Sequence, residues 1–585
     1  MPEPRDKLDA SANGPEDPSG VFDGDAWQQV DWTTHGERVR RLRRRIFKAE
    51  REGDLATVRN LQKLLLRSWS NTLVCVRQVT QRNTGRKTAG VDGRVALTAQ
   101  ARAEVAVQVH ATRSSWQPRP VRRVYIPKAH DKIKKRPLGI PVIMDRCHQA
   151  RVRQALEPQW EARFEARSYG FRPGRGCHDA IGSLFNTLNG KSKRVWILDA
   201  DLAGAFNAID HDHLLGMFGD FPARRMILGW LKAGVVEPGV GFTPTAEGVP
   251  QGGTISPLIL NIALHGLEEA AGVRYREGVH ADAVASTSPA VTRYADDLVV
   301  CCHTGQQAEQ VKAKLAAWLA PRGLEFNEAK TRIVHLTEGF DFLAFNLRRY
   351  PNGKLLIKPS KVAVKEIRGR LTREFRALRG ANVAAVLARI VPIVRGWVAY
   401  HRIGVSKRVF IALTDHLWKL TYKWACWQHS NKPKRWIIQR YYGRFDTVRA
   451  DRWVFGDRDT GAYLPKPAWT EIVRHIPVKG RASPDDPDLT TYWAQRRRKV
   501  KPPLDSYTVR LLSKQDGRCT LCGEDLLTFE DPPQTPQGWE WWYLWVTKKA
   551  IKADYLVHHD QPGTSHDRRT HLVHAHCTRM KQPSR

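Results

Sequence analysis

Residues 293–300 read RYADDLVV, an apolar stretch interrupted by two adjacent acids, Asp296 and Asp297. Adjacent side chains of a strand point to opposite faces, but a tight hairpin turn can present both together. Carboxylates beside apolar strands are costly to bury unless a cation is present. The stretch therefore predicts either a hairpin that holds a metal ion or an ordinary turn containing Asp, and it does not decide between the two.

A second apolar run that ends in acids lies upstream, at residues 195–202, VWILDADL. Phosphoryl transfer to a 3′-hydroxyl uses two divalent ions about 3.5–4 Å apart. Mg²⁺ in such sites takes one or two carboxylates together with substrate phosphates. Asp201 of this run, with Asp296 and Asp297, would supply the carboxylates of a two-metal phosphoryl-transfer centre.

The charge of the chain indicates a polyanionic partner. Its 585 residues include 95 Lys and Arg against 59 Asp and Glu, a formal net charge of +36. Neutralised phosphates release counterions and so drive binding, which favours nucleic acid over a merely basic surface. The length predicts two to four domains.

The sequence has no feature that we read as a membrane or export signal. No apolar run approaches the roughly 20 residues of a membrane span, and the polar N-terminus lacks a secretory pattern. The nine cysteines are odd in number and scattered, which argues against a disulfide framework. We expect a cytoplasmic protein without a membrane partner.

The coarse pattern predicts an α+β protein of several domains. Apolar residues recur at helical spacing from Val39 to Leu65, and Gly53-Asp54 predicts a break with Asp54 as an N-cap. Short β-branched runs predict strands at 121–126, 195–198, 298–302 and 354–357. We divide the chain into a disordered arm (1–27), N-terminal helices (28–118), a mixed α+β region (119–360), a basic helical region (361–442), a linker or DNA-binding region (443–515) and a Cys/His unit (516–585).

Several blocks of the sequence resemble the reverse transcriptases encoded by bacterial group II introns. YADD at 294–297 resembles the YxDD signature of reverse transcriptases, and DADLAGAFNAIDH at 199–211 resembles their first catalytic block. Further blocks follow the family's order: YIPK at 125–128, RPLGIP at 136–141, SYGFRPGR at 168–175, GVPQGG at 248–253 and GFDFL at 339–343. The resemblance implies a right-hand polymerase with fingers and palm, followed by an α-helical thumb and maturase region.

The resemblance also implies roles for individual residues. Asp201, Asp296 and Asp297 would be catalytic and would hold two Mg²⁺ ions. The implied substrate-binding residues are Lys128 and Arg136 for the triphosphate, Phe206 for selection against a 2′-hydroxyl, Gln251 for nucleotide and template, and Lys330 near the primer end.

The helical region interleaves aromatic residues with cations, as in RGWVAYHR at 395–402 and KPKRWI at 432–437. Aromatic rings stack on unpaired bases while Arg and Lys meet phosphates. A helical bundle with Trp in its core is the alternative, and each reading can hold for one face. The segment resembles the maturase region of group II intron proteins, which implies binding of the parent intron RNA through Arg395, Trp397, Arg402, Lys434 and Arg435.

The C-terminal unit has the spacing of a zinc site. Cys519 and Cys522 form C-x₂-C, and His574 and Cys577 form H-x₂-C. Together they would make a tetrahedral Zn²⁺ site, which can supply the folding energy that so small a unit lacks.

Between these pairs, VHHD at 557–560 gives the unit a resemblance to HNH (ββα-metal) nucleases. The resemblance implies His559 as general base and His558 as ligand of a further divalent ion. The central Asn of the motif is not evident, and Thr578 stands where His is expected. A zinc-stapled DNA-binding module without cleavage is therefore the alternative.

The resemblance as a whole implies an intron-encoded RNA-directed DNA polymerase that is also a splicing cofactor. Its partners would be group II intron RNA, target DNA and dNTP, in the bacterial cytoplasm at the nucleoid. Mobility would proceed by target-primed reverse transcription, with bottom-strand nicking by the C-terminal unit. A non-enzymatic maturase with a relic palm and a domesticated reverse transcriptase of defence or retron type are the alternatives.

Overall fold

The computed structural model forms two units, which we describe separately. The first unit comprises Met1–Arg172, Trp196–Ile333 and Lys479–Thr490, and the second comprises Pro173–Val195, Val334–Val478 and Thr491–Arg585. The structure describes residues 22–127, 135–190, 192–276, 283–446, 449–499, 502–504, 506–521, 526–527, 533–547, 551–555, 570–575 and 577. Lys128, Cys522, His558 and His559 lie outside the described residues.

The N-terminal part of the first unit is helical, as predicted. Its helices are α1 (Gly24–Gln29), α2 (Trp32–Arg51), α3 (Leu55–Arg67), α4 (Trp69–Arg77) and α5 (Ala99–Ala111). The predicted cap is confirmed, because the Asp54 side chain accepts a hydrogen bond from the Thr57 amide at 3.0 Å. The predicted disordered arm is wrong at its end, since α1 begins within it and buries Trp27 against Trp32.

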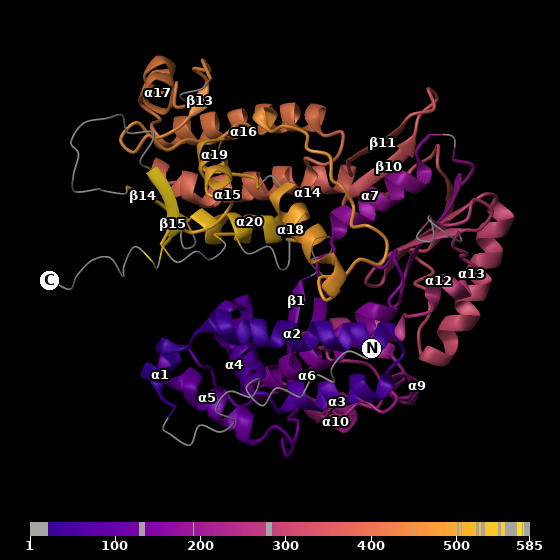
Figure 1. The fold of residues 1–585 in the computed structure, drawn as a ribbon. Coiled ribbons are helices and arrows are strands. Elements are labelled where there is room, and N and C mark those ends of the chain that lie inside the picture. The colour runs from indigo at the N-terminus through magenta and orange to yellow at the C-terminus, as the bar shows by residue number, and fades with distance from the viewer. Residues whose placement is uncertain are drawn as a thin grey trace. The chain divides into compact units, whose positions relative to one another are not determined.

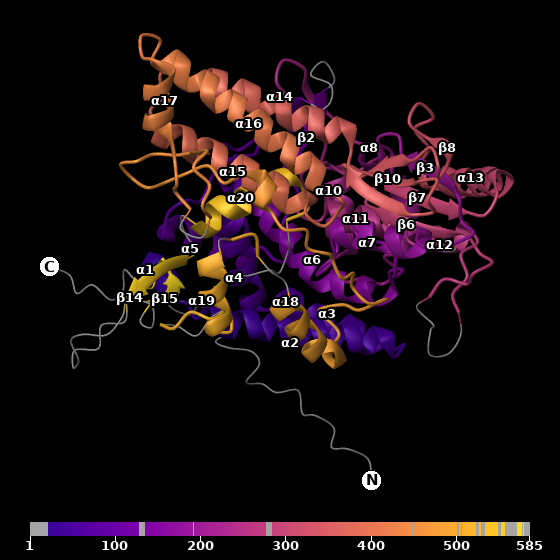
Figure 2. The same ribbon diagram turned by 90° about the horizontal axis from the view of Figure 1, so that it is seen from above.

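A four-stranded antiparallel sheet of the first unit carries Asp201 and Asp297, two of the predicted metal ligands (Figure 2). Its strands run in the order β6 (Ala290–Tyr294), β7 (Asp297–Cys302), β3 (Trp196–Asp201) and β8 (Arg332–His335). The four residues Leu298–Cys301 of β7 are buried, which explains their continuous apolar run. Helix α13 (Gly305–Leu319) packs on β3 and β7, and the two predicted strands of this sheet are confirmed.

A second sheet of the first unit has the order β2-β1-β4-β5, formed by Lys135–Ile140, Val121–Pro127, Val235–Glu237 and Gly241–Thr243. The antiparallel pair β1 and β2 sets Ile126 opposite Arg136. The remaining helices of the unit are α6 (Ile143–Arg163), α8 (Ala205–Ala208), α9 (His211–Met217), α10 (Arg224–Lys232), α11 (Ser256–Ala263) and α12 (Leu267–Ala270).

The second unit is mainly helical. Helices α14 (Lys361–Ala377), α15 (Val383–His401) and α16 (Lys407–Gln428) lie side by side around one apolar core (Figure 1). Helix α20 (Pro536–Trp545) packs so closely on α15 that a Cβ at Gly396 would lie 2.5 Å from the Glu540 nitrogen. The other elements are α7 (Cys177–Leu188), β9 (Phe340–Phe342), β10 (Phe345–Arg349), β11 (Leu355–Pro359), α17 (Lys434–Tyr441), β12 (Tyr442–Gly443), β13 (Val454–Phe455), α18 (Thr490–Lys499), α19 (Ser506–Lys514), β14 (Ile551–Tyr555) and β15 (Thr570–His574).

Helix α15 corrects the statement that no apolar run approaches the length of a membrane span. It is long and apolar enough to cross a membrane, with a mean hydropathy of 1.5. Yet 61% of that window is buried inside the protein, and its residues belong to the helical core. It is therefore the core helix of the second unit.

In the region predicted as a linker or DNA-binding region, 443–515, described residues pack into the cores of both units. Phe455 and Leu464 are part of the helical core of the second unit. In the first unit, Asp485 accepts hydrogen bonds from both Nε (2.9 Å) and an Nη (2.6 Å) of Arg43. That guanidinium is buried and also donates to Glu157 at 2.9 Å. Its charge is thus compensated by two carboxylates, one of them from the supposed linker.

Candidate active site

The acidic pair sits on a two-residue hairpin loop. Strand β6 ends at Tyr294 and β7 begins at Asp297, and these two residues pair, which leaves Ala295 and Asp296 as the loop. Ala295 has φ +56°, a left-handed conformation that tight hairpins usually give to Gly. For an L-residue that conformation costs roughly 1–2 kcal/mol. The surroundings must hold the turn in place.

One such support is the loop that contains Gly170. The Tyr169 amide donates to the Arg293 carbonyl at 2.9 Å, and the Arg293 amide donates to the Arg167 carbonyl at 3.0 Å. A Cβ on Gly170 would lie 2.3 Å from the nitrogen of Ala295. Only glycine allows this close approach to the strained turn.

The side chain of Arg293 is a second support. It is 2% exposed and donates from Nη1 to the Asn261 side-chain oxygen at 2.9 Å and to the Ala295 carbonyl at 3.2 Å. Asn261 in turn donates to the Gly170 carbonyl at 2.8 Å. Neither Arg293 nor Asn261 was predicted from the sequence. An Arg within an apolar strand was the available signal, because a buried guanidinium must find partners.

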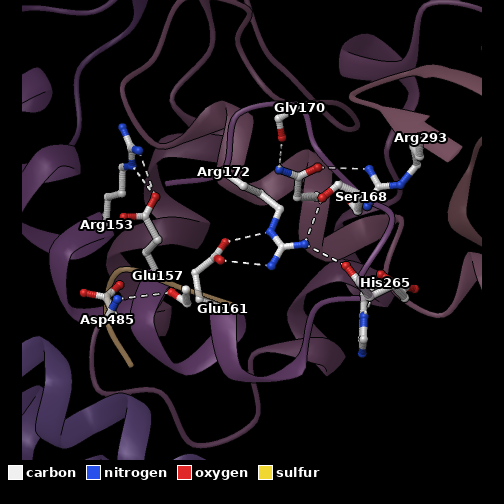
Figure 3. A network of polar contacts seen from close by, with 12 residues as sticks. Arg153, Glu157, Glu161, Ser168, Gly170, Arg172, His265, Arg293 and Asp485 are labelled. Carbon is white, nitrogen blue, oxygen red and sulfur yellow. Dashed lines mark hydrogen bonds and ion pairs between the residues drawn. The ribbon is translucent and has the colours of Figure 1, made fainter. Parts of the chain in front are cut away.

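The loop itself is fixed to α6 by a buried ion pair (Figure 3). Arg172 donates to both carboxylate oxygens of Glu161 at 2.9 Å. It also donates to the carbonyls of Glu165 at 2.7 Å and Ser168 at 2.9 Å. This set of contacts connects the helix, the loop and the hairpin into one rigid support for the acids.

The structure brings the three predicted acids together. Asp201 stands opposite Asp297 in the β3–β7 register, and like charges so placed repel each other. Burial, and then the neighbouring Asp296 and Asp201, raise the pKa of Asp297 to about 7. Burial is also the main cause of the raised pKa of Asp296. A cluster of acids that resist ionisation in this way is suited to a cation.

Protein cations and donors surround this cluster. Lys330 Nζ lies 2.5 Å from Asp201 Oδ2, and the Asn327 amide donates to the Asp201 carbonyl at 2.8 Å. Arg332 lies 3.0 Å from Asp199. Burial raises the pKa of Asp296, and the charge of Arg136 partly opposes that rise, so this predicted triphosphate ligand lies within electrostatic reach of the acids.

The two remaining predicted substrate residues are connected through the 248–253 loop. The Val249 amide donates to the Phe206 carbonyl at 2.5 Å, and the Gly139 amide donates to the Gln251 carbonyl at 2.8 Å. The Phe206 ring is half-buried and packs against the core of the unit. The loop therefore joins the helix that follows Asp201 to strand β2.

Comparisons with known proteins agree with this geometry. Residues 126–347 match the family model of reverse transcriptase (RNA-dependent DNA polymerase), and residues 27–109 match its N-terminal domain. Residues 364–442 match the maturase-specific domain of group II introns. The chain belongs to the group II intron reverse transcriptases. Its functions are RNA-directed DNA polymerisation and maturase action in splicing, with intron RNA as partner and a divalent metal as cofactor.

Individual relatives cover different shares of this reverse transcriptase. Protein YkfC of Escherichia coli is 36% identical over 303 residues, 46% of this chain and 79% of that protein. Group II intron-encoded protein LtrA of Lactococcus lactis is 41% identical over 159 residues, 26% of each chain. Maturase-like protein 1 of Euglena gracilis is 26% identical over 391 residues, 65% of this chain and 79% of that protein.

The predicted RNA-binding residues of the maturase domain differ in their exposure to solvent. Trp397 is a correction, because its ring is 4% exposed and belongs to the helical core, where no base can stack. Arg402 is half-buried, and this burial lowers its pKa to about 10. The Arg395 guanidinium lies 5.4 Å from the Tyr543 ring centre. Lys434 and Arg435 are exposed at the start of α17.

Three of the four predicted zinc ligands gather in the C-terminal part of the second unit. The ligand atoms of Cys519, His574 and Cys577 lie within 4.8 Å of one another, and all three residues are buried. The His574 amide donates to Cys519 Sγ at 3.5 Å. Neutral imidazole and thiolate sulfur are the ligands that Zn²⁺ prefers. The donors that the structure describes therefore fit that ion.

Proposed function

We propose that Asp201, Asp296 and Asp297 hold the two Mg²⁺ ions of the polymerase. The observation that carries this assignment is the pairing of Asp201 with Asp297 beside a rigidly supported Asp296, which concentrates acids where burial disfavours their charge. When bound, the ions would neutralise these acids and stabilise charge on the transferring phosphoryl group.

The other residues of the site would orient the substrates. Lys330 holds the carboxylate of Asp201 in place through a contact of 2.5 Å, and Arg136 would meet the triphosphate of the dNTP. Phe206 would exclude a 2′-hydroxyl, and Gln251 would contact nucleotide and template. Lys128, assigned to the triphosphate by the family resemblance, completes this proposed set.

Substitution of Asp296 by Ala tests the assignment. We expect dNTP incorporation on a primed RNA template to fall by at least about 10³-fold. Asp220→Ala is the matched control, because its side chain is 87% exposed and pairs only peripherally with Arg59 at 3.6 Å. Unchanged incorporation by the Asp296 variant would refute the metal site.

The same preparations should be assayed for splicing of the RNA that flanks the reading frame. We expect the Asp296 variant to splice like the wild type, because the maturase domain is a separate part of the chain. Lys434→Ala combined with Arg435→Ala should instead weaken splicing and leave primer extension intact. If the unsubstituted protein splices but incorporates no dNTP, the alternative of a non-enzymatic maturase with a relic palm is favoured.

In intron mobility the chain would act in the cytoplasm by target-primed reverse transcription on DNA. In this scheme intron RNA inserts into one strand, and the nicked opposite strand primes synthesis. Purified chain with its intron RNA should extend a nicked target DNA. A target without a nick serves as the control. Its extension would show that the chain itself nicks DNA.

In the C-terminal unit, Cys519, His574 and Cys577, with Cys522 as the fourth ligand, would hold a structural Zn²⁺. The gathering of the three described ligands supports this. His559 as base and His558 as ligand of a further ion would make the unit a nicking nuclease, and a DNA-binding module is the second candidate. His559→Ala should abolish nicking of target DNA without loss of zinc. Absence of nicking in the wild type would select the DNA-binding module.

A further inference from the structure

The second unit has a pocket of about 610 Å³ in the loop that connects β12 and β13. It is lined by Arg444, residues 449–453 and Trp469. Its volume falls in the range of small-ligand sites, about 300–1,000 Å³. The pocket lies beyond residue 442, where the match to the maturase-specific domain ends, and neither the palm nor the Cys/His group includes it.

Two indole rings form the aromatic part of the pocket. Trp453 is 42% exposed, and the edge of the buried Tyr442 ring supports it at 6.5 Å between ring centres. The Tyr442 hydroxyl is itself fixed by a 2.8 Å hydrogen bond with Thr421. Trp469 contacts the Tyr463 ring edge-on at 6.4 Å. Both indoles are thus supported from the protein side at a pocket that opens to solvent.

Cations outnumber acids around these rings. The Arg449 guanidinium lies 5.2 Å from the Trp469 ring centre, and Lys466 lies 5.9 Å from it. The acid that lines the pocket, Asp451, is compensated by Lys466 at 2.7 Å and accepts from the Trp453 amide at 2.9 Å. Asp451 therefore shapes the loop and does not offer a free negative charge.

Two further guanidiniums complete the pocket. Arg444 and Arg452 are exposed, and no ion pair joins either of them to another residue in the part of the chain that the structure describes. A guanidinium presents a fork of donors that matches a phosphate group. The pocket therefore combines aromatic faces with phosphate-binding cations.

This combination selects a class of ligand. Base–aromatic stacking needs a free base face, which a base inside a duplex does not have. An acidic peptide would satisfy the arginines but leave the indoles without partners. We propose that this hairpin-loop pocket, defined by Arg444, Arg452, Trp453 and Trp469, binds one unpaired nucleotide of a single-stranded nucleic acid. The base lies on the indoles and the phosphate contacts the arginines.

Photocrosslinking of the full chain tests the site directly. The probe is a short single strand that carries one 5-iodouracil, prepared once as DNA and once as RNA, and a duplex of the same sequence. Crosslinked residues are identified by mass spectrometry. This readout reports the position of the base, so the many other cations of this basic chain do not obscure it.

We expect crosslinks to Trp453 or Trp469 with the single strand and not with the duplex. Replacing either Trp by Ala should lower the yield of pocket crosslinks by about 5- to 100-fold, the range expected for loss of one stacked base. Trp453→Phe should retain most of the yield, which separates stacking from a folding defect. Trp541→Ala is the matched control, because Trp541 is 59% exposed elsewhere in the unit.

The DNA and RNA strands identify the source of the nucleotide, and crosslinking of either supports the site. Crosslinks only outside the pocket, equal yields with duplex, or wild-type yields from both Ala variants would overturn the proposal. The Asp296→Ala variant should crosslink like the wild type, since the pocket is independent of the metal site. Failure of the palm assignment and failure of the pocket are therefore separable.

Discussion

The palm acids and the C-terminal Cys/His group are both candidate metal sites, but the protein supports them differently. Around the palm turn, Arg293, Arg172 and the Gly170 loop make a continuous set of backbone and charged contacts. In the Cys/His group the ligands themselves lie close together, with 3.5 Å from the His574 amide to Cys519 Sγ and 3.9 Å between Cys577 and His574. The palm acids are positioned by the surrounding chain, whereas we propose that the Cys/His group is held by the ion that its ligands would bind.

Metal removal should therefore affect the two sites in opposite ways, and this is the largest effect that we expect. A zinc-selective chelator should unfold the segments around Cys519 and Cys577, because structural Zn²⁺ contributes on the order of 10 kcal/mol in small domains. Hydrogen exchange should accelerate there and stay unchanged in residues 290–302. Equal acceleration of hydrogen exchange around the Cys/His group and in residues 290–302 would show that the two sites do not differ in this way.

The palm support should instead fail when one buried contact is broken. Arg172→Met leaves Glu161 buried without its partner and should cost about 3–5 kcal/mol in the first unit. The control is Lys48→Met in the same unit, because its pair with Glu52 at 3.8 Å is exposed on both sides, 58% and 56%, and is worth less than about 1 kcal/mol. Urea unfolding followed by exchange in residues 290–302 measures both, and similar losses would contradict the rigid support.

A buried acid near this support should make stability depend on pH. Burial, and then the charge of Glu165, raise the pKa of Glu268 to about 7 from 4.5. Because the folded pKa lies above the unfolded one, this group's contribution is complete below about pH 4.5 and is lost as the pH rises through 7.

Glu268→Gln removes that loss, so the variant should exceed the wild type by about 2–3 kcal/mol at pH 8. At pH 4.5 the two proteins should differ little. Unfolding by urea at both pH values measures the difference. A gap of the same size at both would show that Glu268 does not titrate in this range.

The smallest effect should come from the exposed cation of the site. Lys330→Met removes one charge-assisted hydrogen bond to Asp201 and should lower dNTP incorporation about tenfold, with little change in stability. Lys312→Met is the control, since its 2.7 Å pair with Glu328 is not part of the acid cluster. Equal activity of the two variants would leave Lys330 without a role in the site.

The acids and strands of the palm could be predicted because their signals are local. Apolar runs that end at Asp201 and begin after Asp297 indicate two strands and the acids of a metal site within a few residues each. The support could not be predicted in this way, since Arg293 meets Asn261 across 32 residues and Arg43 meets Asp485 across 442. Such pairings exist only once the chain has folded.

The error at Trp397 has a different origin. Alternation of aromatics and cations does not tell which face of a helix is buried. The periodicity did contain the answer, because Ile390, Ile393, Val394 and Trp397 recur at the i, i+3, i+4, i+7 spacing of a buried stripe. Giving this apolar spacing more weight than the mixture of aromatic and cationic residues would have placed the Trp397 ring in the core.

The contact between Asp201 and Lys330 can form only late in the synthesis of the chain, because Lys330 is translated long after Asp201. The two residues are separated by 129 positions, which a ribosome takes roughly ten seconds to translate. Strand β7 is synthesised late in that interval, and strand β8 is synthesised only after Lys330. A translation product that stops short of Lys330 therefore has strand β3 without its neighbour β8, and it lacks the lysine that pairs with Asp201.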